Sequence, residues 1–258
     1  MTVCTFYIII YENKKYTTRK IPTMKKLLAF DLDGTLTQHK TPICDENRNM
    51  LEKLSKKYKL IMLGAGACER VYKQLRKFPI DIVGSYGMQQ AEIKDGKFCL
   101  IRNDTYVVDR EFFEKSAAFL REELNLVNYY GNSVEYHASG LVTFPILGTA
   151  APLNEKLAYD PDRSKRRKMY PLVKSVLKGY NVFIGGSSSF DITRGEYNKL
   201  YALSRYCEEN GYTLDQALMI GDDFGEGGND SAVKLGGVDC VEIDDYRAFP
   251  QKTAFLLD

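Results

Sequence analysis

The sequence predicts an α/β protein in which a Rossmann-like parallel sheet carries helices on both faces and a second, α+β domain is inserted. Two patterns support this fold class. Short, almost continuously apolar runs end near Gly or Asp and lead into helical patterns, as parallel strands covered on both faces do. The middle of the chain alternates apolar with polar residues, which is typical of antiparallel strands. The apolar runs are 27–30, 60–63, 80–83, 217–220 and 238–243.

Helical periodicity appears between these runs. Residues 45–57 place Met50 and Leu54 on one face, and 198–210 stop at Gly211, a residue type that favours helix ends. Strands that alternate with helices indicate βαβ units and therefore a parallel sheet. Further helices are expected over 71–78, 110–124 and 163–178.

The antiparallel patterns interrupt the parallel part of the chain. Asp95-Gly96 predicts a tight hairpin turn, and 133–146 and 181–193 are typical of strands. We therefore expect an inserted domain that covers the parallel sheet. The expected division is a core domain of 24–86 and 194–258, a cap domain of 87–193 and an N-terminal extension of 1–23.

Composition argues against several classes of partner. The 258 residues are 44% apolar, and the net charge of +2 is spread along the chain, so neither nucleic acid nor a membrane surface is expected as a partner. The six cysteines form no CxxC pair, which favours reduced thiols and a cytoplasmic location. The apolar run at 6–11 is too short to span a bilayer and lacks the flanks of a signal peptide. We favour a simple upstream extension before Met24 over an extra edge strand at 6–11.

Three aspartates follow two of the predicted strands. Asp31 and Asp33 come after 27–30, and Asp222 comes after 217–220. Ligands of open α/β sheets bind at the carboxyl ends of the strands, so these carboxylates should meet there. Oxygen ligands without cysteine or histidine indicate Mg²⁺ rather than zinc. Because residues two apart share one side of an extended chain, crowding should raise the pKa of one member of the Asp31–Asp33 pair.

The motifs that contain these residues resemble the haloacid dehalogenase (HAD) superfamily of phosphotransferases. DLDGTLT at 31–37 is similar to its first motif, GDDFGEGGND at 221–230 to its fourth, and Lys199, which opens a helix, to its third. The resemblance is strongest to the eukaryotic-type phosphomannomutases and the Cof-like branch with an inserted α/β cap, through GGND at 227–230 and GGSSSFD at 185–191. It covers the chain from the first predicted strand nearly to the C-terminus.

The resemblance implies an enzyme that works through an aspartyl phosphate. Asp31 would attack phosphorus, and Asp33 would protonate the leaving oxygen and then accept a proton from the next acceptor. The paired charges would favour the protonated form of Asp33, while the metal keeps Asp31 ionised. Lys199 would neutralise the transferred phosphoryl group.

The resemblance also implies a metal site and a phosphate site. Metal binding would involve Asp31, the backbone carbonyl of Asp33 and Asp222, with Asn229 and Asp230 supporting the metal's water ligands and Lys199. The backbone of Gly34 and Thr35 would surround the phosphate oxygens.

The second motif departs from the family pattern. The family ends this strand with a Ser or Thr that binds phosphate, whereas Gly66 stands at that position here. We expect the backbone N–H groups of Gly64, Ala65, Gly66 and Ala67 to bind the phosphate instead. A dinucleotide-binding loop is the less favoured alternative, because Glu69 stands where that motif needs Gly.

The predicted cap should select the substrate. Ser189 and Asp191 match the family's sugar-contacting pair, and Lys40 matches a basic substrate residue, so a small sugar phosphate is expected. His137 stands where the family has an arginine, and it is either a weak phosphate or hydroxyl contact or an ordinary strand histidine. A monomer and a homodimer formed through the cap are both compatible with the sequence.

The type of reaction depends on the cap arginines. Phosphomannomutases use them to hold the second phosphate of a hexose bisphosphate, but this chain has His137 and a residue near Gly148 instead. Without the two-pronged guanidinium, a bisphosphate would escape and water would take the phosphoryl group, so a phosphatase is favoured over a phosphohexomutase. A catalytically weak metabolite-binding protein is a remoter alternative. The basic run at 163–168 is interpreted as a solvated helix face rather than as a replacement for the arginines.

Overall fold

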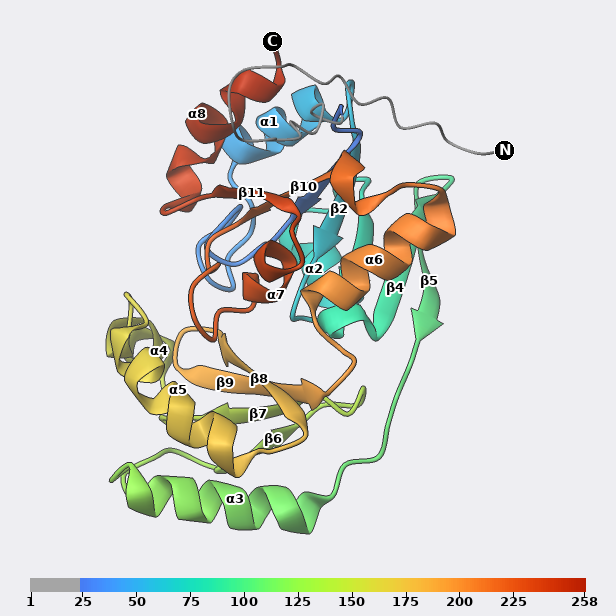
Figure 1. Cartoon of the computed structure of the whole chain (residues 1–258). Coiled ribbons are helices and arrows are strands. Elements are labelled where there is room, and N and C mark those ends of the chain that lie inside the picture. Colours follow the sequence, from blue (N-terminus) through green and yellow to red (C-terminus); the bar gives the residue numbers. More distant parts are fainter. Residues whose placement is uncertain (1–23) are drawn as a thin grey trace, which may run out of the picture.

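The computed structural model describes residues 24–258, so the expected extension at 1–23 and its alternative strand at 6–11 lie outside the described residues. Two sheets lie one above the other, the larger at the top of Figure 1 and the smaller below it. Among residues 24–258, we find no helix with the length and apolarity needed to cross a membrane.

The larger sheet has seven strands. Its parallel part consists, in spatial order, of β11 (Asp239–Glu242), β10 (Ala217–Gly221), β1 (Leu27–Phe30), β2 (Lys59–Leu63) and β3 (Asp81–Gly84). These strands coincide with the five apolar runs. An antiparallel hairpin of β4 (Gln89–Lys94) and β5 (Lys97–Asn103) continues the sheet beyond β3 and turns at Asp95-Gly96, as expected.

Helices cover both faces of the larger sheet (Figure 1). In β1, Leu28 and Phe30 belong to one apolar core, and Leu27 and Ala29 to the other, because successive side chains of a strand point to opposite faces. The α/β fold class is therefore confirmed. The first core includes residues of α1 (Asp45–Leu54), α2 (Cys68–Gln74) and α8 (Phe249–Thr253), and the second includes residues of α6 (Lys199–Asn210) and α7 (Ser231–Leu235).

The smaller sheet is antiparallel and has a core of its own. Its strands, in spatial order, are β6 (Glu135–Tyr136), β7 (Val142–Pro145), β9 (Ser189–Arg194) and β8 (Tyr180–Gly185). Phe113 of α3 (Arg110–Glu123) and Val173 of α5 (Ser164–Val176) belong to the same apolar core as Phe190 of this sheet. The short α4 (Leu153–Tyr159) precedes α5. Helix α3 lies on the side away from the larger sheet (Figure 1).

Four single-turn 3₁₀ helices complete the described elements. They are η1 (Ser85–Gly87), η2 (Leu214–Gln216), η3 (Tyr246–Ala248) and η4 (Ala254–Leu256).

One expected grouping of strands is wrong. The hairpin that turns at Asp95-Gly96 was expected in the inserted antiparallel domain, yet its first strand pairs with β3, with Ala91 opposite Ile82. The reason is that β3 would otherwise be an edge strand, and an antiparallel partner satisfies its free backbone groups. The division into a core of 24–86 and 194–258 and a cap of 87–193 remains a prediction.

Candidate active site

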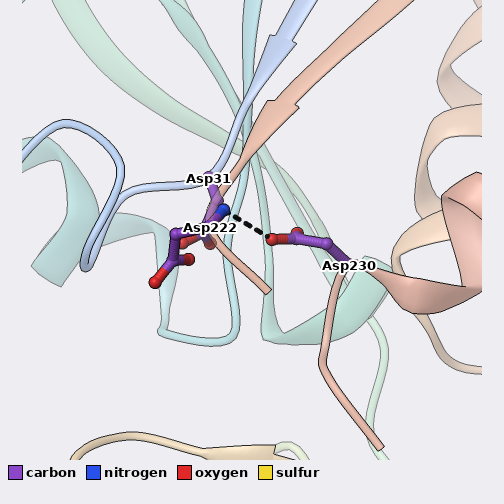
Figure 2. A group of neighbouring side chains, drawn as sticks. All are labelled: Asp31, Asp222 and Asp230. Carbon is purple, nitrogen blue, oxygen red and sulfur yellow. Dashed lines mark hydrogen bonds between the residues drawn. The ribbon is translucent and has the colours of Figure 1, made fainter. Parts of the chain in front are cut away.

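Three carboxylates meet at the carboxyl ends of β1 and β10. Asp31 directly follows β1, Asp222 directly follows β10, and Asp230 directly precedes α7. One carboxylate oxygen of each lies within 4.8 Å of the others. Figure 2 shows them grouped at the strand ends, where the backbone N–H of Asp222 donates to Asp230 Oδ2 at 3.2 Å.

Lys199 is fully buried between two of these carboxylates. Its Nζ donates to Asp31 Oδ1 at 2.5 Å and to Asp230 Oδ1 at 2.6 Å. The side chain of Asn198 caps α6 by accepting from the N–H of Tyr201 at 2.9 Å, which fixes the helix start that carries the lysine. Burial alone would lower the pKa of Lys199, but Asp230 and Asp31 raise it above its ordinary value, so the ammonium stays charged.

The carboxylate of Asp33 binds partners other than those of Asp31. Its Oδ1 accepts from Gln74 Nε2 at 2.6 Å and from the backbone N–H of Lys40 at 2.8 Å. Its Oδ2 accepts from Arg70 Nη1 at 3.2 Å. Asp33 is therefore held by groups on the first loop and on α2, and no contact joins it to the carboxylate cluster among the described residues.

The pKa shifts of the two aspartates are the reverse of the expected ones. Burial raises the pKa of Asp31 well above its ordinary value, although Lys199 opposes this. Burial also acts on Asp33, but His39, Arg70 and the amide of Gln74 together outweigh it and lower the pKa. Burial lowers the pKa of His39 itself, which favours its neutral imidazole at neutral pH. The cation beside Asp33 is then the guanidinium of Arg70. The expectation that crowding protonates Asp33 is wrong, because the two carboxylates have separate partners.

The carboxylate cluster fits a hard cation. It contains oxygen ligands only, and burial raises the pKa of Asp222 despite the opposing charge of Arg163, so a further positive charge would stabilise it. Asn229 Oδ1 is a buried oxygen without a hydrogen-bond partner among residues 24–258. Asn229, like Asp31 and Asp222, lines a cavity between the two sheets that is described below. This donor set is the kind that holds Mg²⁺.

The loop after β1 packs directly against Asp222. Gly34 has a φ of 102°, and a Cβ there would lie 2.1 Å from Asp222 Oδ2, so only glycine fits. Thr35 is buried, and its hydroxyl lies 3.5 Å from Asp222 Oδ1. Both residues are thus next to the cluster, as expected of a phosphate-binding turn.

The loop after β2 fits the expected phosphate site only in part. The N–H of Gly64 donates to the carbonyl of Val83 at 2.9 Å, so the expectation that this donor binds phosphate is wrong. This N–H group is used in sheet pairing, because Gly64 directly follows β2 and keeps the hydrogen-bond pattern between β2 and β3. Ala65, Gly66 and Ala67 line the cavity described next.

A cavity of about 440 Å³ lies between the two sheets. Asp31 and Asp33 line it from the larger sheet, and Thr143 and Asp191 line it from the smaller one. Its size is within the range of small-molecule sites. Cationic or imidazole side chains contribute from both parts, namely His39, Lys40, Arg70, His137, Lys156 and Arg163.

The basic run at 163–168 takes part in the site. Arg163 forms an ion pair with Asp222, and its Nε lies 3.2 Å from Asp223 Oδ2. Arg167 Nη2 lies 2.6 Å from Asp223 Oδ1. The interpretation of this run as a solvated face is therefore wrong for Arg163 and Arg167. Even Arg166 is buried, with its Nε 2.8 Å from Asp160 Oδ2.

A chain of polar contacts runs along the face of the smaller sheet that lines the cavity. His137 Nε2 lies 3.0 Å from the hydroxyl of Thr143, which donates to Asp191 Oδ1 at 3.2 Å. Tyr86 lies in η1, in the half of the molecule that contains the larger sheet (the larger half; the part with the smaller sheet is the smaller half). Its hydroxyl donates a hydrogen bond to Asp191 Oδ2 at 3.0 Å. Its ring stacks on Phe183 of β8 with centroids 4.7 Å apart. Asp191 is thus held from both halves, and burial raises its pKa.

The other expected substrate residues differ in their placement. Lys40 is exposed at the cavity, and Ser189 lines it while its Oγ donates to the carbonyl of Gly185 at 3.0 Å. A Cβ on Gly148 would lie 2.2 Å from the carbonyl oxygen of Tyr130, so this position cannot hold an arginine without a shift of the backbone.

Several residues of the site were missed at the sequence level. Arg70 and Gln74 are four residues apart on a helix after the second strand, so the sequence indicates that they lie on the same helix face. Arg163 lies in the basic run for which a solvated face is the simpler interpretation, and Tyr86 and Lys156 have no local signal. Their positions result from packing between segments far apart in the chain.

Taken together, an aspartate after the first parallel strand, a buried lysine that reaches it and an acidic cluster after the strand beside it define a HAD-superfamily phosphotransferase. The chain is an enzyme of this class. The family model "Eukaryotic phosphomannomutase" matches residues 47–236, so the chain belongs to the eukaryotic phosphomannomutase family. This assignment argues against the remoter alternative from the sequence, a catalytically weak metabolite-binding protein.

Curated relatives agree with this assignment. The phosphomannomutase of Encephalitozoon cuniculi is 26% identical over 243 residues, which are 88% of this chain and 93% of the relative. The phosphomannomutase of Triticum aestivum is 27% identical over 219 residues, covering 80% and 85%. That of Saccharomyces cerevisiae is 26% identical over 217 residues, covering 79% and 83%.

Solved structures share the fold. An IMP-nucleotidase of Plasmodium falciparum has a TM-score of 0.63 at 14% identity and covers 92% of this chain and 68% of its own. A haloacid dehalogenase-like hydrolase from B. subtilis has a TM-score of 0.53 at 16% identity, covering 83% and 87%. At such identities these neighbours bear on the fold alone.

Proposed function

We propose that the protein is a phosphohexomutase that moves a phosphoryl group between two positions of a small sugar phosphate through Asp31. The family match over 47–236 supports this, and the observation that carries it is the set of cationic side chains that line the cavity. A mutase must retain a bisphosphorylated sugar between its two half-reactions. It therefore needs positive charge at both ends of the cavity.

The described residues supply the groups for the transfer. A carboxylate oxygen of Asp31 forms a bond to phosphorus while the bond from phosphorus to the sugar oxygen breaks. Because its pKa is lowered, Asp33 starts as a carboxylate: it takes the proton of a sugar hydroxyl that attacks the aspartyl phosphate, and it returns this proton to the leaving sugar oxygen when the other phosphoryl group moves to Asp31. Lys199, held 2.5 Å from Asp31, offsets the negative charge of the phosphoryl group.

A magnesium site belongs to this proposal. Asp31, Asp222 and the backbone carbonyl of Asp33 would hold Mg²⁺, with Asp230 and Asn229 beside it. When bound, Mg²⁺ would neutralise charge on the transferred phosphoryl group. The turn of Gly34 and Thr35 would orient the phosphate oxygens next to Asp31.

The opposite end of the cavity would hold the sugar and its second phosphate. Asp191, fixed by Tyr86 and Thr143, is suited to accept from sugar hydroxyls, and Ser189 lies on the same strand. Lys40 and Lys156 line the cavity and supply positive charge there. Lys156 comes from α4, and its Nζ lies 3.0 Å from the carbonyl of Thr149, next to the position where the family arginine was expected.

A sugar phosphatase remains the second candidate. The observation that favours it is the absence of arginine at His137 and Gly148, because no guanidinium fork is available at either position. The sequence alone favoured this candidate. Lys40 and Lys156, which line the cavity, and the family assignment now favour the mutase.

The two candidates are separated by their products. The protein would be incubated with mannose 1-phosphate or glucose 1-phosphate and Mg²⁺, with and without a hexose 1,6-bisphosphate activator, and with Asp31→Asn as the inactive control. Conversion to the 6-phosphate with little free phosphate is the expected result. Free phosphate without the isomer would overturn the mutase, and His137→Arg should then restore part of the isomerisation.

The location and partners are proposed from the thiols and the cavity. The described cysteines carry free thiols, which supports the predicted cytoplasmic location. A small phosphorylated metabolite is the proposed partner, and a monomer or a homodimer formed through the cap domain remains the prediction for the assembly.

A further inference from the structure

Arg70 occupies the space that a side chain at Gly66 would need. A Cβ built on Gly66 would lie 2.1 Å from Arg70 Nη2 and 2.6 Å from its central guanidinium carbon. The guanidinium therefore packs directly over the glycine. Gly66 is the position at which the resemblance leads one to expect a phosphate-binding hydroxyl, so a charged group fills the place of that hydroxyl.

One side of this guanidinium is anchored. Nη1 donates to Gln74 Oε1 at 2.8 Å and to Asp33 Oδ2 at 3.2 Å. Gln74 is buried and in turn donates to Asp33 Oδ1 at 2.6 Å and to Thr37 at 2.9 Å, which ties α2 to the first loop. The anchor leaves Nη2 over Gly66, and the side chain lines the cavity with 41% of its surface exposed.

We propose that Arg70 is the phosphate-binding side chain of the second motif in this protein and replaces the missing hydroxyl at Gly66. Its ligand is the phosphoryl group that is transferred to Asp31, and the inference rests on the proposed function. An arginine offers several donors in one plane, which suits the oxygens of a phosphate monoester better than a hydroxyl does. The loop and the helix then act as a unit, in which the absence of a side chain at Gly66 makes room for Arg70.

This arrangement makes the two positions interdependent. A serine at residue 66 must displace the guanidinium, and loss of the guanidinium leaves a gap into which a serine hydroxyl fits. Gly66→Ser should therefore be harmful alone and helpful when Arg70 is shortened. A residue that only supported the helix, or only held Asp33, would not produce this reversal of sign.

The experiment measures binding of orthovanadate, a phosphate mimic, by calorimetry in the presence of Mg²⁺. Arg70→Ala is expected to weaken binding about 10- to 100-fold, the range for a lost charged hydrogen bond. Gly66→Ser alone should also weaken it. The double variant should bind several-fold more tightly than Arg70→Ala. Arg76→Ala is the matched control, since Arg76 is also about half exposed but pairs with Asp45 outside the cavity.

Either of two results would overturn the inference: vanadate binding by Arg70→Ala equal to that of the unaltered protein, or a double variant no better than Arg70→Ala. Failure of the proposed function is a different outcome. A protein that binds vanadate through Arg70 but forms no 6-phosphate would contradict the mutase and leave the role of Arg70 intact. An unaltered protein that binds no vanadate with Mg²⁺ would overturn both.

Discussion

Arg163 of the smaller half forms an ion pair with Asp222 of the larger half, and Asp222 is one of the three carboxylates of the proposed metal site. The guanidinium thus competes with a metal ion for the same carboxylate. It also reaches the cavity, so a cation that neutralises Asp222 would release Arg163 toward an anionic substrate. This links the occupancy of the metal site to the charge that the smaller half offers to a phosphate.

The first prediction follows from this competition. Arg163→Met should tighten Mg²⁺ binding about 3- to 10-fold, because a nearby positive charge is removed from a mostly buried carboxylate. Calorimetric titration of the substrate-free protein with Mg²⁺ measures it. Arg167→Met is the matched control, since Arg167 contacts Asp223 rather than the cluster and should change the affinity less. Weaker Mg²⁺ binding by Arg163→Met would contradict the competition.

The second prediction concerns the nucleophile. Asp31→Asn should lower turnover of para-nitrophenyl phosphate at least about a thousand-fold, because an amide is a poor nucleophile toward phosphorus. Stability should not fall, since burial already disfavours the charged form of Asp31. Thermal unfolding of the same preparation serves as the control. Phosphate release close to that of the unaltered protein would exclude Asp31 as the nucleophile. Asp33→Asn should also be severe, although it can still trap a phosphoenzyme with this activated leaving group.

The third prediction is metal dependence. Treatment with EDTA should reduce activity to background and Mg²⁺ should restore it, because the proposed ligands are all oxygens. Asp222→Ala should raise the Mg²⁺ concentration needed for half-maximal activity strongly. Full activity in EDTA, or zinc as the best activator, would show that the site is of another kind.

The fourth prediction concerns pH and folding. Burial would raise the pKa of Asp160, but hydrogen bonds from Arg166 and from the N–H of Lys165 outweigh it and lower the pKa. The pair therefore stabilises the fold above the unfolded pKa of about 3.9, and this stability is lost as the pH falls through the folded pKa. Asp160→Asn should cost about 3–5 kcal/mol at neutral pH, since it leaves a buried arginine without its partner.

Urea unfolding across the pH range from neutral to acid measures this effect. The difference between Asp160→Asn and the unaltered protein should begin to shrink below about pH 4, where the unfolded chain takes up the proton, and should be smallest once the pH has fallen through the lowered pKa of folded Asp160, because the carboxyl is then protonated in both states. Asp162→Asn, at an exposed aspartate of the same segment, is the control and should change stability little. A difference that stays constant down to strong acid would reject the ion pair as its source.

The fifth prediction concerns Tyr86. Tyr86→Phe keeps the ring that stacks on Phe183 but removes the hydroxyl that donates to Asp191. KM for the sugar phosphate should rise about 10-fold, the usual effect of a lost hydrogen bond to a charged group, with a smaller change in kcat. Tyr106→Phe is a matched control, because Tyr106 also stacks on a ring and accepts from the N–H of Arg194, outside the cavity. An unchanged KM would remove Tyr86 from the substrate site.

Much of this architecture could be predicted because its signals are local. A strand covered on both faces must be apolar throughout, so the five parallel strands were visible as runs. Asp31 and Asp222 were expected to meet because strand ends of a parallel sheet lie at one edge. The hairpin turn at Asp95-Gly96 was also local, since both residues adopt positive φ there. The local sequence did not indicate which sheet the hairpin would join, because that choice depended on the free edge of β3.

The sequence by itself therefore determined the fold class, the nucleophile candidate, the meeting of Asp31 with Asp222 and the family resemblance, since each of these follows from the order and spacing of neighbouring residues. Tertiary structure alone decided which charges meet. Lys199 reaches Asp31, Arg163 reaches Asp222, and Arg70 covers Gly66 because helices from separate segments pack at one edge of the sheet. Electrostatic energies fall off with distance and depend on burial, so the pKa of Asp33 and the charge at each end of the cavity followed from packing and not from sequence spacing.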